Sequence, residues 1–131
     1  MQMSKTSLAT PRARVKGLGS AKSGTEHFWR QRVTAVALIP LTLVFVVVLL
    51  MLKGADHKAA TALLGNAFVG ILMVCFVIAG CVHMRLGMQV IIEDYVHEEG
   101  PKLFLLMLNT FFTAVIGLAS IYALLKISFG N

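Results

Sequence analysis

Three long apolar stretches separated by short polar segments dominate the pattern of the chain. The first stretch, from Val33 to Leu52, contains 20 residues and no charged side chain. Twenty helical residues rise about 30 Å, which matches the hydrocarbon core of a bilayer. Two further stretches follow at about residues 63–92 and 103–125. The pattern predicts an all-α membrane protein with three transmembrane helices, at about residues 33–52, 63–92 and 103–125.

The polar segments set the expected boundaries. Residues 53–60 and 93–102 predict short loops, and Gly100-Pro101 is expected to break the helix in the second one. Pro40 lies inside the first stretch and predicts a kink, which membrane helices tolerate. We therefore divide the chain into a basic N-terminal arm with an interfacial segment, residues 1–32, and a three-helix membrane anchor domain, residues 33–126.

The composition supports the bilayer as the solvent. Of the 131 residues, 57% are hydrophobic and 14% are charged. A soluble domain carries roughly a quarter charged residues. Too few polar groups are left to cover a globule in water.

Most of the positive charge lies before the first apolar stretch. Seven of the twelve Lys and Arg precede Val33, accompanied by a single acid, Glu26. A basic segment beside a spanning helix holds that end on the cytoplasmic side, and this interpretation is favoured over nucleic-acid binding. Three spans then place the C-terminus in the periplasm. The second polar loop is not basic, so the orientation rests on the arm alone.

His83 is the ionisable group that lies deepest in an apolar stretch. Such a group is costly in lipid and normally faces the interior of a helix bundle, with a partner. Cys75, Ala79 and Gly87 share its helix face at four-residue spacing. Small residues allow a helix backbone or a flat ligand to approach, so Ala79 and Gly87 could flank a slot for a porphyrin. Plain helix packing and an interhelical hydrogen bond from His83 are the simpler alternatives.

Asp94 and Tyr95 form a second polar position on the same stretch. Eleven residues are almost three helical turns, so Asp94 falls on the face of His83, about 16 Å nearer the inside surface. A phenol can donate a hydrogen bond to a quinone carbonyl, and a carboxylate can relay a proton. An ordinary interfacial pair is the alternative.

Two segments resemble a known family. The sequence HMRLGMQVIIEDYV, residues 83–96, resembles the His-x3-Gly-x6-Asp-Tyr motif of the small membrane anchor subunit of succinate dehydrogenase (complex II). Residues 19–35 are similar to the segment before the first helix in members of the alphaproteobacterial and mitochondrial type. The resemblance implies half of a heterodimeric helix bundle, completed by a second, cytochrome b556-like anchor subunit in a bacterial or mitochondrial inner membrane.

The resemblance also implies roles for individual residues. His83 would be one axial ligand of haem b, and the partner anchor would supply the other. Tyr95, with Asp94 beside it, would bind ubiquinone. Arg32 resembles the family arginine near the haem propionates and the quinone pocket, with Arg30 as the competing candidate.

The implied function is that of a non-catalytic subunit in an electron-transfer complex. It would hold the flavoprotein and iron–sulfur subunits to the membrane and help to deliver electrons to ubiquinone. The chain has no dinucleotide fingerprint and no cysteine cluster for iron–sulfur centres. A non-redox membrane scaffold or small transport subunit and the anchor of a fumarate reductase are the alternatives.

Overall fold

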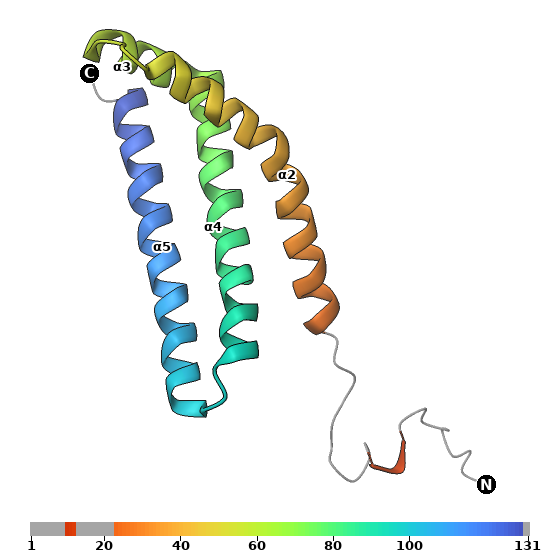
Figure 1. The fold of residues 1–131 in the computed structure, drawn as a ribbon. Coiled ribbons are helices and arrows are strands. Elements are labelled where there is room, and N and C mark those ends of the chain that lie inside the picture. The colour runs from red at the N-terminus through yellow and green to blue at the C-terminus, as the bar shows by residue number, and fades with distance from the viewer. Residues whose placement is uncertain (1–9, 13–22, 130–131) are drawn as a thin grey trace, which may run out of the picture.

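Three long helices make up most of the structure. The computed structural model describes residues 10–12 and 23–129, so most of the predicted basic arm lies outside the described residues. From residue 23 onward, the elements are α2 (Ser23–Leu52), α3 (His57–Gly65), α4 (Ala67–Tyr95) and α5 (Glu99–Phe129) (Figure 1). By length and composition, α2, α4 and α5 can each cross a membrane. The predicted class, an all-α protein with three long apolar helices, is confirmed.

Helix α4 lies between the other two long helices. It packs against α2 on one side and α5 on the other, and α3 contacts both α4 and α5 (Figure 1). The start of α2, the end of α4 and the start of α5 lie at the same end of the molecule, which we call the Tyr95 end. The opposite end, where α3 joins α4, we call the Asn66 end.

Helix α2 bends part of the way along its length (Figure 1). Pro40 lies inside this helix. A proline has no N–H to donate, and its ring displaces the carbonyl four residues earlier, so a bend is expected there. The second half of α2 consequently leans over α4, where Phe45 stacks on Phe76 with ring centroids 4.5 Å apart.

The Asn66 end differs from the prediction of a loop followed by one long helix from residue 63. Helix α3 forms within that region, because the Asp56 side chain accepts a hydrogen bond from the Ala59 N–H at 2.7 Å. The chain then breaks at Asn66, whose side chain accepts from the Phe68 and Val69 N–H groups at 3.0 and 3.3 Å. Asp and Asn are favoured N-caps, so each starts a helix of its own.

The turn at the Tyr95 end is shorter than the predicted loop at residues 93–102. Helix α4 continues to Tyr95 and α5 begins at Glu99. The expected break at Gly100-Pro101 is wrong, because Pro101 lies in the first turn of α5, where the missing N–H has no helical acceptor. Lys102 closes the turn by donating from Nζ to the Glu93 carbonyl at 3.2 Å.

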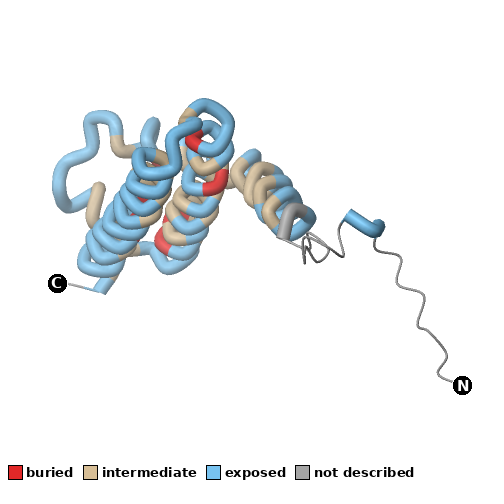
Figure 2. The backbone as a smooth tube through the Cα atoms, turned by 90° about the horizontal axis from the view of Figure 1, so that it is seen from below, coloured by how far each residue is buried: buried red, intermediate tan, exposed pale blue. Residues whose placement is uncertain are grey.

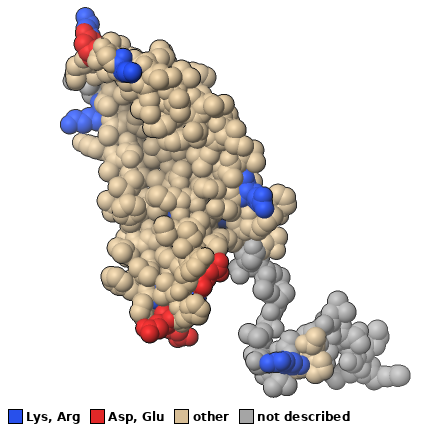
Figure 3. Space-filling model, in the orientation of Figure 1, with Lys and Arg blue, Asp and Glu red and all other residues tan. Residues whose placement is uncertain are grey.

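Little of the described chain is buried. The buried apolar side chains are Val48, Met73, Leu86 and Ile92, and most of the surface along the helices is exposed (Figure 2). On the face shown in Figure 3, charged side chains lie near both ends and at one edge near mid-height, and an uncharged belt separates the upper group from the others. Lipid tails are as apolar as leucine, so helix association in such a belt depends on close packing and on hydrogen bonds between helices.

Close packing and a hydrogen bond both join α4 to α5. Gly117 is buried, and a Cβ built on it would lie 3.2 Å from Cys81 Sγ. Asn109 Nδ2 donates to the Arg85 carbonyl at 2.9 Å. At the Asn66 end, a further bond joins α5 to α3, because Ser128 Oγ donates to the Leu64 carbonyl at 3.2 Å.

The contact at Gly117 generates a stability prediction. Gly117→Val is expected to destabilise the purified protein by about 1–3 kcal/mol, because the new side chain overpacks against Cys81. Thermal unfolding in detergent measures the loss. Cys81→Ala in the same background removes the sulfur and should restore part of the stability. A double variant no more stable than Gly117→Val would contradict this account.

Candidate functional site

The imidazole of His83 points from α4 toward α2 and is half-buried between the two helices. Its Nδ1 lies 3.1 Å from Thr34 Oγ1, and its Nε2 lies 3.5 Å from Gln31 Nε2. His83 precedes Tyr95 by 12 residues, which corresponds to about 18 Å along the helix axis. Because its ring lies between α4 and α2, the histidine faces the interior of the helix assembly rather than the surrounding lipid.

The neighbours of His83 favour one of the two tautomers of its ring. The single proton of the Thr34 hydroxyl is directed to carbonyls of its own helix, with Arg30 O at 2.8 Å and Gln31 O at 3.1 Å. Thr34 Oγ1 must then accept from an Nδ1–H of His83. The amide nitrogen of Gln31 only donates, so it faces a lone pair on Nε2. An imidazole with its proton on Nδ1 and a lone pair on Nε2 is compatible with both contacts.

The slot for a flat ligand that was predicted beside His83 is filled on one side by a side chain of the same protein. A Cβ built on Gly87 would lie 3.4 Å from Gln31 Nε2, so the side chain of Gln31 occupies the space that this glycine provides. Ala79 lies one turn away on the other side of His83 and is half-buried. Within the described residues, Gln31 Oε1 and His27 Nε2 are buried without a hydrogen-bond partner.

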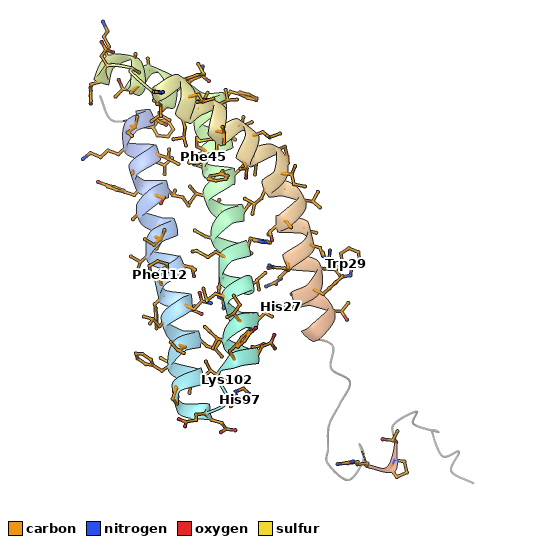
Figure 4. The ribbon with its side chains drawn as sticks, viewed as in Figure 1. His27, Trp29, Phe45, His97, Lys102 and Phe112 are labelled. Atoms are coloured by element: carbon orange, nitrogen blue, oxygen red, sulfur yellow. The ribbon has the colours of Figure 1, made fainter. Side chains whose placement is uncertain are left out.

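A polar hollow opens between α2 and α4 on the Tyr95 side of His83. Its volume is about 490 Å³. His27 points between the two helices, whereas Trp29 points away from them (Figure 4). Arg85 of α4 contributes to the wall. The polar lining residues are Glu26, His27, Arg30, Arg85, Gln89 and Glu93.

The two candidate arginines occupy different surroundings. Arg30 lines the hollow and pairs with Glu26 at 2.6 Å, although both side chains remain largely exposed. The Arg32 guanidinium lies over the ring of Phe28, 5.1 Å from its centroid. Of these two candidates, Arg30 borders the hollow and Arg32 does not.

Asp94 and Tyr95 lie at the end of an unbroken α4. Because no break separates them from His83, helical spacing keeps Asp94 on the His83 face. Both side chains are exposed, and Tyr95 retains 79% of its accessible surface. The chain by itself therefore forms one wall of any site that uses them.

The residues that contact His83, Thr34 and Gln31, were not predicted. His27, Gln31 and Thr34 recur at positions i, i+4 and i+7, which is one face of a helix. That pattern was available in the sequence. It was overlooked because the interfacial segment and the first span were treated as separate at residue 33, whereas α2 runs through both.

Within the described residues, no three side chains of the His, Cys, Asp or Glu type come together as a metal site. A metal bound at His83 would therefore take this residue as a single ligand from the described part of the chain. These features define a multi-pass helical membrane protein with a half-buried imidazole between two of its described helices.

The sequence pattern of the family described as "Succinate dehydrogenase/Fumarate reductase transmembrane subunit" matches residues 6–118. The match covers most of the chain. The chain belongs to this family.

Individual relatives agree with the family match. The "Succinate dehydrogenase hydrophobic membrane anchor subunit" of Paracoccus denitrificans is 37% identical over 121 residues, which is 92% of this chain and 93% of the relative. The subunit of the same name from Rickettsia bellii (strain RML369-C) is 37% identical over 63% of this chain and 66% of its own length. The "Succinate dehydrogenase membrane anchor subunit" of Reclinomonas americana is 32% identical over 63% of this chain and 71% of the relative.

Proposed function

We propose that the chain is the hydrophobic membrane anchor subunit of a succinate dehydrogenase. It would hold the flavoprotein and iron–sulfur subunits at an inner membrane and contribute to a haem b site and a ubiquinone site. The observation that carries this proposal is the half-buried imidazole of His83, held between α4 and α2, in a chain of this family.

The surroundings of His83 fit one axial haem ligand. Nε2 carries the lone pair that a metal needs, and its contact with Gln31 is long at 3.5 Å. The buried Gln31 Oε1 without a partner indicates a side chain that other groups can displace at little cost. When bound, a haem exchanges single electrons with neighbouring redox groups. The second ligand would come from a cytochrome b556-like anchor subunit, which makes haem binding dependent on assembly.

Tyr95 and Asp94 would serve the quinone. The Tyr95 hydroxyl would donate a hydrogen bond to a ubiquinone carbonyl, and the Asp94 carboxylate would accept or pass on a proton. Their exposure means that partner subunits must close the pocket and exclude water. Ala79 and Gly87 would give the haem room beside His83, and Arg30, with Arg32 as the alternative, would face the haem propionates or the quinone pocket.

The family description also includes fumarate reductases, and it does not define the direction of electron flow. The names of the relatives favour succinate oxidation. A non-redox scaffold or small transport subunit differs in having no pigment, so the absorption spectrum of the purified complex separates the two classes.

The basic arm determines the proposed orientation. From residue 23 onward, Lys and Arg are nearly balanced between the ends, with Arg30, Arg32, Arg85 and Lys102 toward the Tyr95 end and Lys53, Lys58 and Lys126 toward the Asn66 end. The arm adds five more, namely Lys5, Arg12, Arg14, Lys16 and Lys22. Positive residues near a span are retained inside, so the Tyr95 end would face the cytoplasm and the C-terminus the periplasm.

The ligand assignment predicts the effect of His83→Ala. The haem content of the purified complex should fall by roughly tenfold or more, because an iron–nitrogen bond is lost. The reduced-minus-oxidised absorption spectrum measures this content. His57→Ala, which changes an exposed histidine at the Asn66 end, is the control and should keep the wild-type spectrum. A full haem spectrum in the His83→Ala complex would remove the basis of the assignment.

The quinone assignment predicts a different effect for Tyr95→Phe. Loss of one hydrogen bond, worth about 1–1.5 kcal/mol, should lower the rate of ubiquinone reduction by about five- to tenfold, with haem retained. The rate of succinate-dependent ubiquinone reduction by the purified complex measures this effect. Tyr122→Phe alters an exposed tyrosine on α5 and should leave turnover unchanged. Equal turnover in both variants would count against a role for Tyr95.

The orientation can be tested with single cysteines. With Cys75 and Cys81 replaced by serine, Ala55→Cys and Glu98→Cys place a thiol at exposed positions in opposite turns. A membrane-impermeant maleimide added to intact cells should label position 55, and should label position 98 only after permeabilisation. The reverse pattern would mean that the Tyr95 end faces the periplasm.

A further inference from the structure

We propose that Thr34 is a positioning residue for the haem ligand. Its hydroxyl accepts the Nδ1–H of His83, which keeps the Nε2 lone pair available for iron and makes the imidazole a stronger electron donor. This inference rests on the proposed function, in which His83 binds haem, and it assigns a role to a residue on a different helix.

The first support is the direction of the Thr34 hydroxyl. It lies 2.8 Å from the Arg30 carbonyl and 3.1 Å from the Gln31 carbonyl, so its proton is used within α2. Its lone pairs remain for His83 Nδ1 at 3.1 Å. A hydroxyl whose proton is committed in this way acts on the imidazole as an acceptor.

The second support is the rigidity of the acceptor. Threonine is β-branched, so its side chain has few rotamers in a helix, and the bond to α2 carbonyls selects one of them. The oxygen is therefore fixed relative to the backbone of α2. An imidazole hydrogen-bonded to it is fixed in ring orientation as well as in tautomer.

The third support comes from the other side of the ring. Gln31 Nε2 lies 3.5 Å from His83 Nε2, and an amide N–H that faces this nitrogen is compatible with a lone pair on it. Gln31 is the side chain that has to leave when iron binds, since it faces the metal-binding nitrogen. Thr34 faces the other nitrogen and can stay.

The hydrogen bond has a measurable electronic consequence. Donation from Nδ1–H to an oxygen increases the basicity of the ligating nitrogen, which favours the more positive, oxidised iron. Thr34 therefore lowers the reduction potential of the haem relative to a site without this acceptor. A merely structural role for Thr34 would not predict this direction.

The test is a spectroelectrochemical titration of haem in the intact complex. Thr34→Val keeps the size and removes the acceptor, so the midpoint potential should shift upward. Thr34→Ser keeps a hydroxyl and should return the potential to near the wild-type value. Thr110→Val is the matched control, because the Thr110 hydroxyl donates to the Leu106 carbonyl within α5 at 2.9 Å. The haem midpoint potential of the Thr110→Val complex should equal that of the wild type.

The outcomes separate this inference from the function on which it rests. A Thr34→Val complex that contains haem at the wild-type potential would overturn the role of Thr34 and leave the proposed function standing. A wild-type complex without haem would overturn the proposed function and the inference with it. If Thr34→Val does not assemble, Thr34→Ala is compared with Thr34→Ser: a higher potential in the alanine variant supports the proposal, and equal potentials overturn it.

Discussion

The polar contact between α2 and α4 is the interaction on which the rest of the site depends. Between helices in lipid there is no hydrophobic drive for association, and a buried polar group without a partner is costly. His83 has a polar neighbour on each side of its ring, because Nδ1 lies beside the Thr34 hydroxyl and Nε2 beside the Gln31 amide. The same contact holds the first helix against the second and turns the imidazole away from lipid. The proposed chemistry depends on this polar contact, while the stacking of Phe45 on Phe76 also joins the two helices.

Helix α4 is the rigid element that relates the two levels of the site. It runs without interruption from its cap at Asn66 to Tyr95, where the Val96 N–H still bonds to the Ile92 carbonyl. His83 and Asp94 consequently keep the same face at a separation set by the helical rise. The packing of Gly117 on Cys81 holds α5 against the opposite side of this helix. An imidazole and a carboxylate–phenol pair are thus presented at two depths by a single element.

The described part of the chain forms only part of a binding site. The remaining walls of that site have to come from outside it. Tyr95 is mostly exposed, and His27 Nε2 and Gln31 Oε1 are buried without partners in the described part of the chain. Few apolar side chains are buried, although α2, α4 and α5 are each long enough to span a membrane. These features are expected of a subunit whose pockets are closed by other chains, and they agree with the family to which the chain belongs.

The sequence alone determined the three spans, the enclosed histidine and the alignment of Asp94 with His83, because hydropathy and helical periodicity are local properties of the chain. It misplaced the helix ends at Asn66 and Pro101, where a side-chain cap and a tolerated first-turn proline outweigh the composition of the segment. Only the tertiary structure decided that Thr34 and Gln31 meet His83, and that Gly87 admits Gln31. Such contacts depend on how two helices are rotated and offset against each other. Packing across the whole assembly sets that rotation, and neither helix encodes it separately.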